Sequence, residues 1–396
     1  MTRFDFVARQ RSLVATGNVM PVVPDSWTGQ DIANAVDRVL NTTVEGHEDA
    51  PTVVVGVIPF DTRRPAYLYR PARVVRQENP GPGQGGDVAF PLEVAEQHPD
   101  PDGYREIVGR AVASIGSSAL DKVVLGRCVT VDSPREPCAD EVFARLRRGN
   151  PDAYVSRVEL GGCFEEPGVL LGASPELVLS CTGSLVETLP LAGTTPRGVD
   201  PVADQAAAQA LLRSRKDLTE HSHVVQAVAE AFGRHADDVE LPERPQLVAT
   251  PVVWHLGTPV RGRLKPGHSP LHLLYDLHPT PAVCGWPSAE ARDFIARNEG
   301  FDRGVFAGLV GWVDARGDCE WALVLRAGLL QGHRATMFAG AGIVAASDPR
   351  LELLETAAKM KTFVSALGVL GRTPESLPPT RGRTPSDDPP TTPKEK

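Results

Sequence analysis

The stretch Phe338-Ala-Gly-Ala-Gly-Ile-Val344, followed by Glu352-Leu-Leu-Glu355-Thr-Ala-Ala-Lys359, joins a glycine-rich segment to a charged one. Glycine allows a backbone to approach a ligand closely, because it has no side chain to intervene. The two carboxylates and the ammonium are three and four residues apart, so a helix would place all three on one face. The stretch predicts a glycine-rich turn close to a ligand, followed by a helix with one charged face.

A second acidic pair, Asp217 and Glu220, has the same three-residue spacing in a segment with a helical pattern. Two such pairs that face one another would form an oxygen-rich cage, which suits a hard cation such as Mg²⁺. The alternative is two solvated helix faces, since Asp and Glu are mostly surface residues. Spacing alone leaves both interpretations open.

The composition limits the class of protein. The chain has 396 residues, of which 41% are hydrophobic, and a formal net charge of −9. This length suits one large domain or two ordinary ones, and the hydrophobic fraction is normal for a globular protein. The negative charge argues against nucleic acid or an anionic membrane surface as a partner. It does not exclude a small anionic substrate, because local basic residues can override a mild global field.

The cysteines and the N-terminus indicate a reduced, soluble setting. None of the six cysteines belongs to a C-x-x-C pair, which disfavours a zinc ribbon or a redox dithiol and predicts reduced thiols in a cytoplasmic protein. The N-terminus lacks a cationic start followed by an apolar run, so we expect no secretory signal, and no stretch has the roughly 18 apolar residues of a membrane span. We expect a cytoplasmic monomer. The cysteines are Cys128, Cys138, Cys163, Cys181, Cys284 and Cys319.

Two segments have the composition of irregular chain. Residues Arg372–Lys396 contain almost no apolar residue, so they cannot bury enough surface to offset their ordering entropy, and we expect a disordered tail. The Gly- and Pro-rich segment Gln77–Asp87 predicts a surface loop or linker. Because neither flanking part looks self-sufficient, we expect one catalytic domain over residues 1–371.

Short apolar runs bounded by turn residues predict strands. The turn Gly183-Ser184 and the turn Ala315–Asp318 each join two neighbouring strands into a hairpin. The predicted strands are Thr52–Ile58, Lys122–Val131, Gly168–Ala173, Leu177–Cys181, Leu185–Leu189, Phe306–Val313, Trp321–Ala327 and Ala335–Ala339.

Apolar residues that recur every three or four positions predict helices between these strands. Hairpins interleaved with helices indicate an α+β fold, in which helices cover large, mainly antiparallel sheets. The predicted helices are Tyr104–Ile115, Cys138–Arg148, Pro201–Phe232, Pro270–His278, Ala289–Asn298 and Leu351–Leu367.

Three charged residues stand at the ends of apolar runs. Lys122 opens one such run, and a buried amine that is neutral can act as a general base; the alternative is an edge lysine that extends to solvent. Glu176 lies between two apolar strands, where a carboxyl group can stay protonated and act as a general acid, unless it is a solvated turn residue. Arg326 ends a third run and could bind a substrate carboxylate or form a structural ion pair.

Two histidines, His255 and His278, lie in apolar surroundings and could orient a polar substrate or serve as core histidines. The chain has no G-x-S-x-G elbow and no P-loop, and no G-x-G-x-x-G motif directly follows a predicted strand. No nucleotide or flavin is therefore indicated.

Taken together, these segments resemble the chorismate-binding enzymes, over roughly Leu13 to Leu370, and the motifs follow the family's order. This resemblance implies the family's fold, with two large antiparallel sheets packed face to face and helices outside. The matching segments are Asp121–Leu125, Gly172–Glu176, Leu191–Thr194 with Arg197-Gly198, Lys216–His221, Trp254–Leu256, Phe338–Val344 and Glu355–Lys359.

Within the family the chain is most similar to siderophore-type isochorismate synthases, because Leu277–Ala282 matches that branch. Ala192 stands where the aminodeoxychorismate branch has a nucleophilic lysine, and alanine cannot form a covalent adduct. Val283 and Cys284 stand where Leu-Ser is commoner in this branch. The departure puts the fine shape of the pocket in doubt, but not the class of enzyme. The rival interpretations are a salicylate synthase, a non-catalytic chorismate-binding homologue and an acidic interaction protein.

The resemblance also implies roles for individual residues. Lys122 would deprotonate water for attack at C2 of chorismate, and Glu176 would protonate the departing 4-hydroxyl. Chorismate would be the substrate and Mg²⁺ the cofactor, with Glu220 and Glu355 as ligands and Asp217 and Glu352 acting through water. The substrate-binding residues would be Gly193, Thr194, His255, His278, Arg326, Ala341, Gly342 and Lys359.

Overall fold

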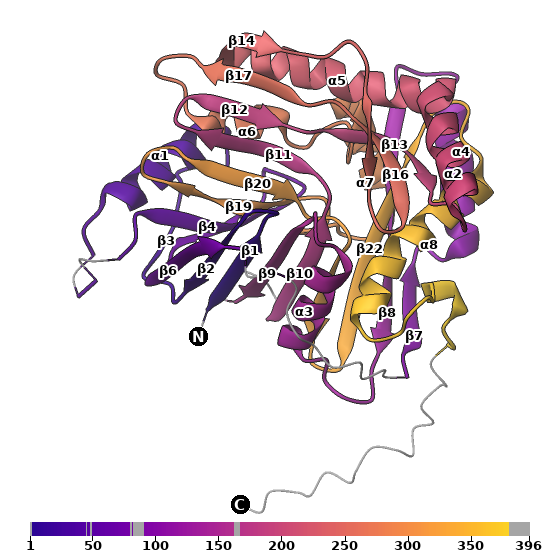
Figure 1. Cartoon of the computed structure of the whole chain (residues 1–396), viewed down its shortest axis with the longest axis horizontal. Coiled ribbons are helices and arrows are strands. Elements are labelled where there is room, and N and C mark those ends of the chain that lie inside the picture. Colours follow the sequence, from indigo (N-terminus) through magenta and orange to yellow (C-terminus); the bar gives the residue numbers. More distant parts are fainter. Residues whose placement is uncertain are drawn as a thin grey trace, which may run out of the picture.

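A computed structural model describes residues 2–44, 46–47, 50–79, 81, 91–161 and 167–379. The expected α+β fold is confirmed: two large antiparallel sheets pack face to face, and helices cover their outer faces (Figure 1). A third, three-stranded sheet, which the sequence did not predict, packs against α4 and α5. Among the described residues no helix is long and apolar enough to cross a membrane.

The first large sheet joins strands from both ends of the chain. Its pair β8 and β22, near one edge, aligns residues more than 200 positions apart. In spatial order the strands are β18 (Gly285–Trp286), β8 (Lys122–Asp132), β22 (Arg334–Ile343), β21 (Ala327–Gln331), β10 (Gly168–Ser174), β9 (Tyr154–Leu160), β1 (Arg3–Val7), β2 (Arg11–Thr16) and β6 (Arg73–Glu78), and β7 (Glu93–His98) also pairs with β8.

The second large sheet and the small sheet are also antiparallel. The second sheet runs β14 (Ala236–Glu240), β17 (Val260–Leu264), β12 (Leu185–Thr188), β11 (Leu177–Thr182), β20 (Cys319–Leu323), β19 (Leu309–Asp314), β4 (Val53–Ile58), β5 (Tyr67–Arg70) and β3 (Met20–Pro21). The small sheet runs β13 (Leu191–Pro196), β16 (Val253–Gly257) and β15 (Gln246–Ala249).

Eight α-helices are present among the described residues. Three apolar clusters hold the layers together: one lies between the two large sheets, and the other two lie beneath the helices on the outer faces. The helices are α1 (Gly29–Asn41), α2 (Pro101–Ile115), α3 (Ala139–Gly149), α4 (Pro201–Arg213), α5 (Arg215–His235), α6 (Pro270–Leu277), α7 (Ser288–Asn298) and α8 (Pro349–Ala366), followed by a 3₁₀ turn (Pro374–Ser376).

Three predicted elements were wrong in detail. The predicted helix Pro201–Phe232 is two helices, because Ser214 leaves helical geometry and its hydroxyl accepts the Asp217 amide hydrogen as an N-cap. The predicted strand Trp321–Ala327 breaks at Arg326, whose φ is +49°. The glycine-rich segment is the end of strand β22 and not a turn.

The first eight residues of the predicted disordered tail are ordered. Residues 372–379 include the 3₁₀ turn and bury Leu377, and the Pro378 carbonyl accepts a hydrogen bond from the Val94 amide. Packing of Leu377 against the first large sheet accounts for this order, which composition alone did not reveal. Residues 380–396, and most of the predicted loop Gln77–Asp87, lie outside the described residues.

Candidate active site

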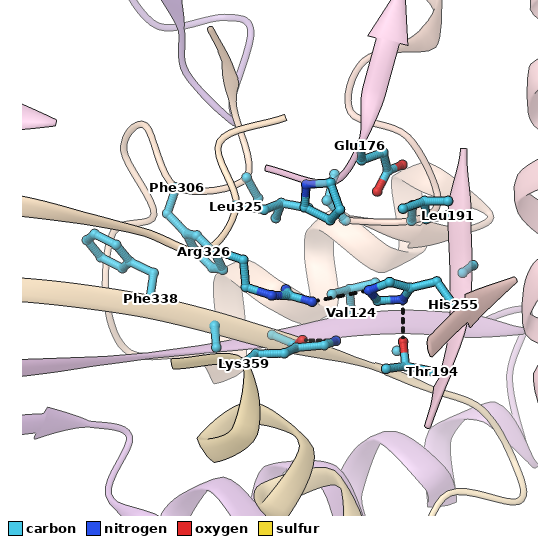
Figure 2. A pocket seen from close by; sticks show the side chains of 18 of the residues that line it. Val124, Glu176, Leu191, Thr194, His255, Phe306, Leu325, Arg326, Phe338 and Lys359 are labelled. Carbon is cyan, nitrogen blue, oxygen red and sulfur yellow. Dashed lines mark hydrogen bonds between the residues drawn. The ribbon is translucent and has the colours of Figure 1, made fainter. Parts of the chain in front are cut away.

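A narrow cavity lies where the small sheet meets β22, α5 and α8. Its walls come from the ends of β10, β20 and β13 and from glycines of β22. Figure 2 shows Arg326, His255 and Thr194 in a row, with Glu176 on one side of the row and Lys359 on the other. One end of the cavity is apolar and is lined by Val124, Ala282, Val283, Phe306, Ala307, Leu325 and Phe338.

The row of three side chains is a hydrogen-bonded chain. Arg326 Nη2 lies 3.2 Å from His255 Nε2, and His255 Nδ1 lies 3.0 Å from Thr194 Oγ1. Burial and the nearby Arg326 lower the pKa of His255 well below its usual value, so the ring is neutral. Because a guanidinium can only donate, Nε2 accepts, and the Nδ1 proton points to the Thr194 hydroxyl. The arrangement fixes the Arg326 guanidinium at the cavity.

Arg326 is buried, yet the protein supplies no hydrogen-bonded carboxylate for it among the described residues. Burial lowers its pKa to about 10, although Glu355 and Glu176 oppose the shift. The group therefore stays charged at neutral pH. A buried guanidinium with a free donor edge favours an anionic ligand, and a carboxylate matches its fork. The backbone strain of φ +49° at this residue is typical of functional sites.

Glu176 follows β10 and is 3% exposed. Burial raises its pKa to about 8, while a hydrogen bond from the Leu191 amide and the charge of Lys122 partly oppose the shift. The carboxyl group is therefore mainly protonated at neutral pH and can donate a proton. Its backbone is held in place, because its carbonyl accepts the Leu323 amide hydrogen of β20.

Lys122 is fully buried at the start of β8, and its Nζ lies 3.1 Å from Glu220 Oε1 on α5. Burial would raise the pKa of Glu220, but Lys122 and Lys216 outweigh it and lower the pKa. Both side chains pass over Gly342, where a Cβ atom would lie 2.1 Å from Glu220 Oε1. Gly342 is thus required by the close approach of this ion pair. Glu220 lines the cavity, and Lys122 lies behind it.

The other predicted metal-binding carboxylates also pair with lysines. Glu352 Oε1 lies 2.9 Å from Lys216 Nζ. Glu355 Oε1 lies 2.6 Å from Lys359 Nζ, which also donates to the Gly340 carbonyl at 2.8 Å. Burial raises the pKa of Glu352, and the neighbouring charge of Glu355 adds to the shift. The lysines therefore offset part of the repulsion between these buried carboxylates.

Asp217 joins this group from the first turn of α5. Burial raises its pKa, and Glu220 and Glu355 add to the shift, so the carboxylates influence one another. Carboxylate oxygens are the donor atoms that a hard divalent cation prefers, and its charge would offset their mutual repulsion. The side chains are not preassembled, however: within the described chain no three His, Cys, Asp or Glu side chains are close enough together to hold a metal.

Gly193 holds the small sheet against α5. It is the extra residue of a bulge in β13, with φ +80°, and a Cβ atom there would lie 3.0 Å from Asp217 Cβ. Glycine tolerates this left-handed conformation without steric cost. The bulge turns Thr194 toward His255, so Gly193 contributes to the site through its backbone.

Gly193 does not itself line the cavity, and neither do two further predicted substrate-binding residues, His278 and Ala341. His278 is buried, its Nε2 lies 3.3 Å from the Pro59 carbonyl, and burial lowers its pKa to about 3. Its ring serves the packing of α6 against the loop after β4. Ala341 directs its methyl group into the core, because side chains alternate along β22, and its neighbours Gly340 and Gly342 line the cavity instead.

Arg303 is a cavity residue that sequence reasoning missed. It donates to the carbonyls of Val283 (2.8 Å) and Val124 (2.7 Å) and to the buried Glu299 carboxylate. Glu299 in turn accepts the Gly126 amide hydrogen at 2.6 Å. This network joins the apolar end of the cavity to β8. The four-residue spacing of Glu299 and Arg303 was the available signal, but such pairs are common on solvated helix faces.

Comparison with known proteins identifies the family of this chain. A family model described as chorismate-binding enzyme matches residues 85–368. The chain is 37% identical to isochorismate synthase DhbC of Bacillus subtilis, over 92% of this chain and 94% of the relative. It is 38% identical to isochorismate synthase EntC of Escherichia coli K12, over 80% and 81% of the two chains.

A solved structure from Bacillus anthracis, described as a candidate 2,3-dihydroxybenzoate-specific isochorismate synthase DhbC, has a TM-score of 0.86 and 37% identity. The match covers 93% of this chain and 96% of the other. The shared fold, the matched family model and this level of identity over most of both chains agree with one another. The chain belongs to the chorismate-binding enzyme family.

Proposed function

We propose that this chain is an isochorismate synthase, which converts chorismate to isochorismate by adding water at C2 with loss of the 4-hydroxyl. The observation that carries the proposal is Glu176, a buried carboxyl group with a pKa raised to about 8, in the same cavity as the buried guanidinium of Arg326. Chorismate is a dicarboxylate with a hydroxyl group, a poor leaving group. The reaction therefore requires a proton donor for the hydroxyl and an anion-binding group for a carboxylate. The named relatives act in the same reaction class.

The proton transfers balance within the site. Lys122 is the proposed base, which takes a proton from the water whose oxygen bonds to C2. As the diene shifts, the C4–O bond breaks, and Glu176 gives its proton to the departing hydroxyl, which leaves as water. The net change is an isomerisation. The Lys122 amine lies behind Glu220, 3.1 Å away, so Glu220 positions the amine as well as lining the cavity wall.

Substrate carboxylates are expected at the cationic part of the cavity. Arg326, held by His255 and Thr194, offers its free donor edge, and Lys359 lies below this row (Figure 2). The backbone of Gly340 and Gly342 allows close approach, because neither residue has a side chain. Gly193 contributes through the bulge that orients Thr194.

Magnesium fits the donor chemistry of the four carboxylates. Glu220 and Glu355 would hold the ion, with Asp217 and Glu352 acting through water. When bound, the ion would offset the negative charge of a substrate carboxylate and withdraw charge from the diene. The lysine partners of these residues show that the protein already places positive charge among them.

We further propose a setting for the enzyme: a cytoplasmic monomer that feeds 2,3-dihydroxybenzoate or salicylate for siderophore synthesis and binds neither nucleic acid nor membrane. The negative net charge supports the absence of a nucleic-acid partner. The described cysteines are free thiols, as expected in a reducing compartment. Relatives named for DhbC and for vibriobactin support the siderophore pathway.

Product analysis tests the function directly. The purified chain is incubated with chorismate and Mg²⁺, and the products are separated by chromatography. Isochorismate as the main product would support the proposal. Salicylate with pyruvate would indicate a salicylate synthase, and unchanged chorismate under conditions where it binds would indicate a non-catalytic homologue.

A further inference from the structure

His221 follows the proposed metal ligand Glu220 in the sequence, but it points away from the cavity. Its ring is 3% exposed and lies between α5 and the small sheet. His221 Nδ1 lies 3.2 Å from the carbonyl oxygen of Ala192, and Nε2 lies 2.7 Å from Thr258 Oγ1. Both ring nitrogens therefore have partners, one near the start of β13 and the other just after the end of β16.

The two partners determine which nitrogen carries the proton. A carbonyl oxygen can only accept, so Nδ1 donates to Ala192. A neutral ring then leaves Nε2 as an acceptor for the Thr258 hydroxyl. Thr258 is 1% exposed, so loss of this contact would leave a buried polar group without a partner. The Thr258 hydroxyl thus selects the tautomer that binds Ala192.

The Ala192 carbonyl needs this donor because of the bulge at Gly193. The bulge shifts the pairing of β13 with β16 between Ala192 and Thr194, which interrupts the regular ladder of hydrogen bonds. A buried carbonyl displaced from a ladder requires another donor. His221 supplies it from the same helical turn that carries Glu220.

Ala192 and Thr194 both line the cavity on either side of the bulge. One ring therefore connects the helix that presents Asp217 and Glu220 to the strand that presents Thr194 to His255. We propose that His221 is a positioning residue. Thr258 holds its ring in the Nδ1–H tautomer, and the ring then fixes the position of β13 relative to the carboxylates of α5. This inference rests on the proposed function only for its kinetic readout.

The test compares Thr258→Val with Thr258→Ser and with a matched control. Valine keeps the shape of threonine but removes the hydroxyl. Thr130→Val is the control, because Thr130 Oγ1 bonds Thr336 Oγ1 at 2.9 Å between β8 and β22 and neither residue lines the cavity. Loss of one buried hydrogen bond corresponds to about tenfold in an equilibrium or rate constant.

We expect Thr258→Val to lower kcat/KM for chorismate about tenfold, with a loss of melting temperature similar to that of Thr130→Val. Thr258→Ser should restore kcat/KM to within about twofold of the native value. His221→Asn, whose amide can still donate to Ala192, should retain more activity than His221→Leu. Equal kcat/KM in Thr258→Val and Thr130→Val would overturn the proposal.

Nitrogen-15 NMR of the imidazole ring provides a readout that needs neither turnover nor metal. In the native protein His221 should be in the Nδ1–H tautomer alone. In Thr258→Val both neutral tautomers of His221 should be populated. A native Nε2–H tautomer would refute the proposal even if the enzyme is active. If the native chain makes no isochorismate but shows the Nδ1–H tautomer, the proposed function fails while the positioning contact stands.

Discussion

Glu176 acquires its role from its surroundings. An exposed glutamate would be ionised at neutral pH, but burial raises the pKa of this one to about 8. A general acid works only while it holds its proton, so activity should be high below this pKa and fall as the pH rises through it. We expect the alkaline limb of the kcat profile to lie near pH 8, as measured by initial rates across pH 6 to 10 in matched ionic strength.

Glu176→Gln should remove that limb. The amide keeps the size of the side chain but cannot give a proton to the leaving hydroxyl, so kcat should fall on the order of 10²–10⁴. Chorismate should still bind, because Arg326 and Lys359 are unchanged. An unaltered alkaline limb in a still active Glu176→Gln enzyme would assign the limb to another group.

Lys122→Ala should abolish water addition for a separate reason. Lys122 is the fully buried amine beside Glu220, so its loss removes the proposed base, at a cost on the order of 10²–10⁴ in rate. Single-turnover kinetics with saturating chorismate would isolate this step from binding. Near-native isochorismate formation would mean that the water is activated elsewhere, and His255 is then the candidate within the cavity.

The sequence identified most of these residues but not all of their positions. Lys122, Glu176 and Arg326 were found because a charged residue at the end of an apolar run is unusual. His278 looked equivalent to His255, yet only His255 reaches the cavity, since neighbouring backbone decides the direction of a ring. Arg303 escaped notice because two of its partners are carbonyls, which have no signature in sequence, and its spacing from Glu299 is common on solvated helix faces.

The glycines of strand β22 are needed because other side chains approach the backbone closely, and not because the backbone must be flexible. Its glycines predicted a turn, but they lie in a regular strand that the Lys122–Glu220 pair crosses.

Gly342→Ala should push the Glu220 carboxylate aside, because the new methyl group would overlap it, and should lower kcat/KM at least tenfold. Gly233→Ala in α5 is the control: nothing lies within 4 Å of its Cβ, so it should preserve activity and stabilise the helix by about 0.5–1 kcal/mol.

The carboxylates of α5 and α8 should differ when neutralised. Glu220→Gln and Glu355→Gln should both weaken the response to Mg²⁺, because an amide lacks the charge that holds the ion. Glu220→Gln also leaves the buried Lys122 without its anion, which should cost on the order of 3 kcal/mol of folding stability, whereas Glu355→Gln lies in a more exposed pair and should cost less. Magnesium titration of the rate, with thermal melting in EDTA, would separate these effects. Full magnesium-dependent activity in both variants would remove the proposed metal site.

For the whole molecule, local patterns predicted the class of fold but not its pairing. Most predicted strands and helices exist, because their periodicity reflects burial. The pairing of β8 with β22, and of β1 with β9, joins segments far apart in sequence, and no local pattern records such partners. The small sheet was missed for the same reason: β13, β16 and β15 are short and come together only through tertiary contacts.

We propose that residues 1–371 form one cooperative domain. The apolar cluster between the large sheets draws on β1, β4, β9 and β19, which lie on both sides of residue 80 in the sequence. Limited proteolysis followed by urea unfolding should therefore give a single transition, even if the chain is cut between residues 80 and 90. Two fragments that separate and unfold independently would contradict this.

The central claim is that water adds to chorismate as the 4-hydroxyl leaves. Incubation of the enzyme with chorismate and Mg²⁺ in ¹⁸O-labelled water, followed by mass spectrometry of the products, tests it most directly. The account predicts isochorismate that carries one ¹⁸O atom, in the C2 hydroxyl, and product formation slowed on the order of 10²–10⁴ when Glu176→Gln replaces the native enzyme. Isochorismate without label, or a product other than isochorismate, would contradict it.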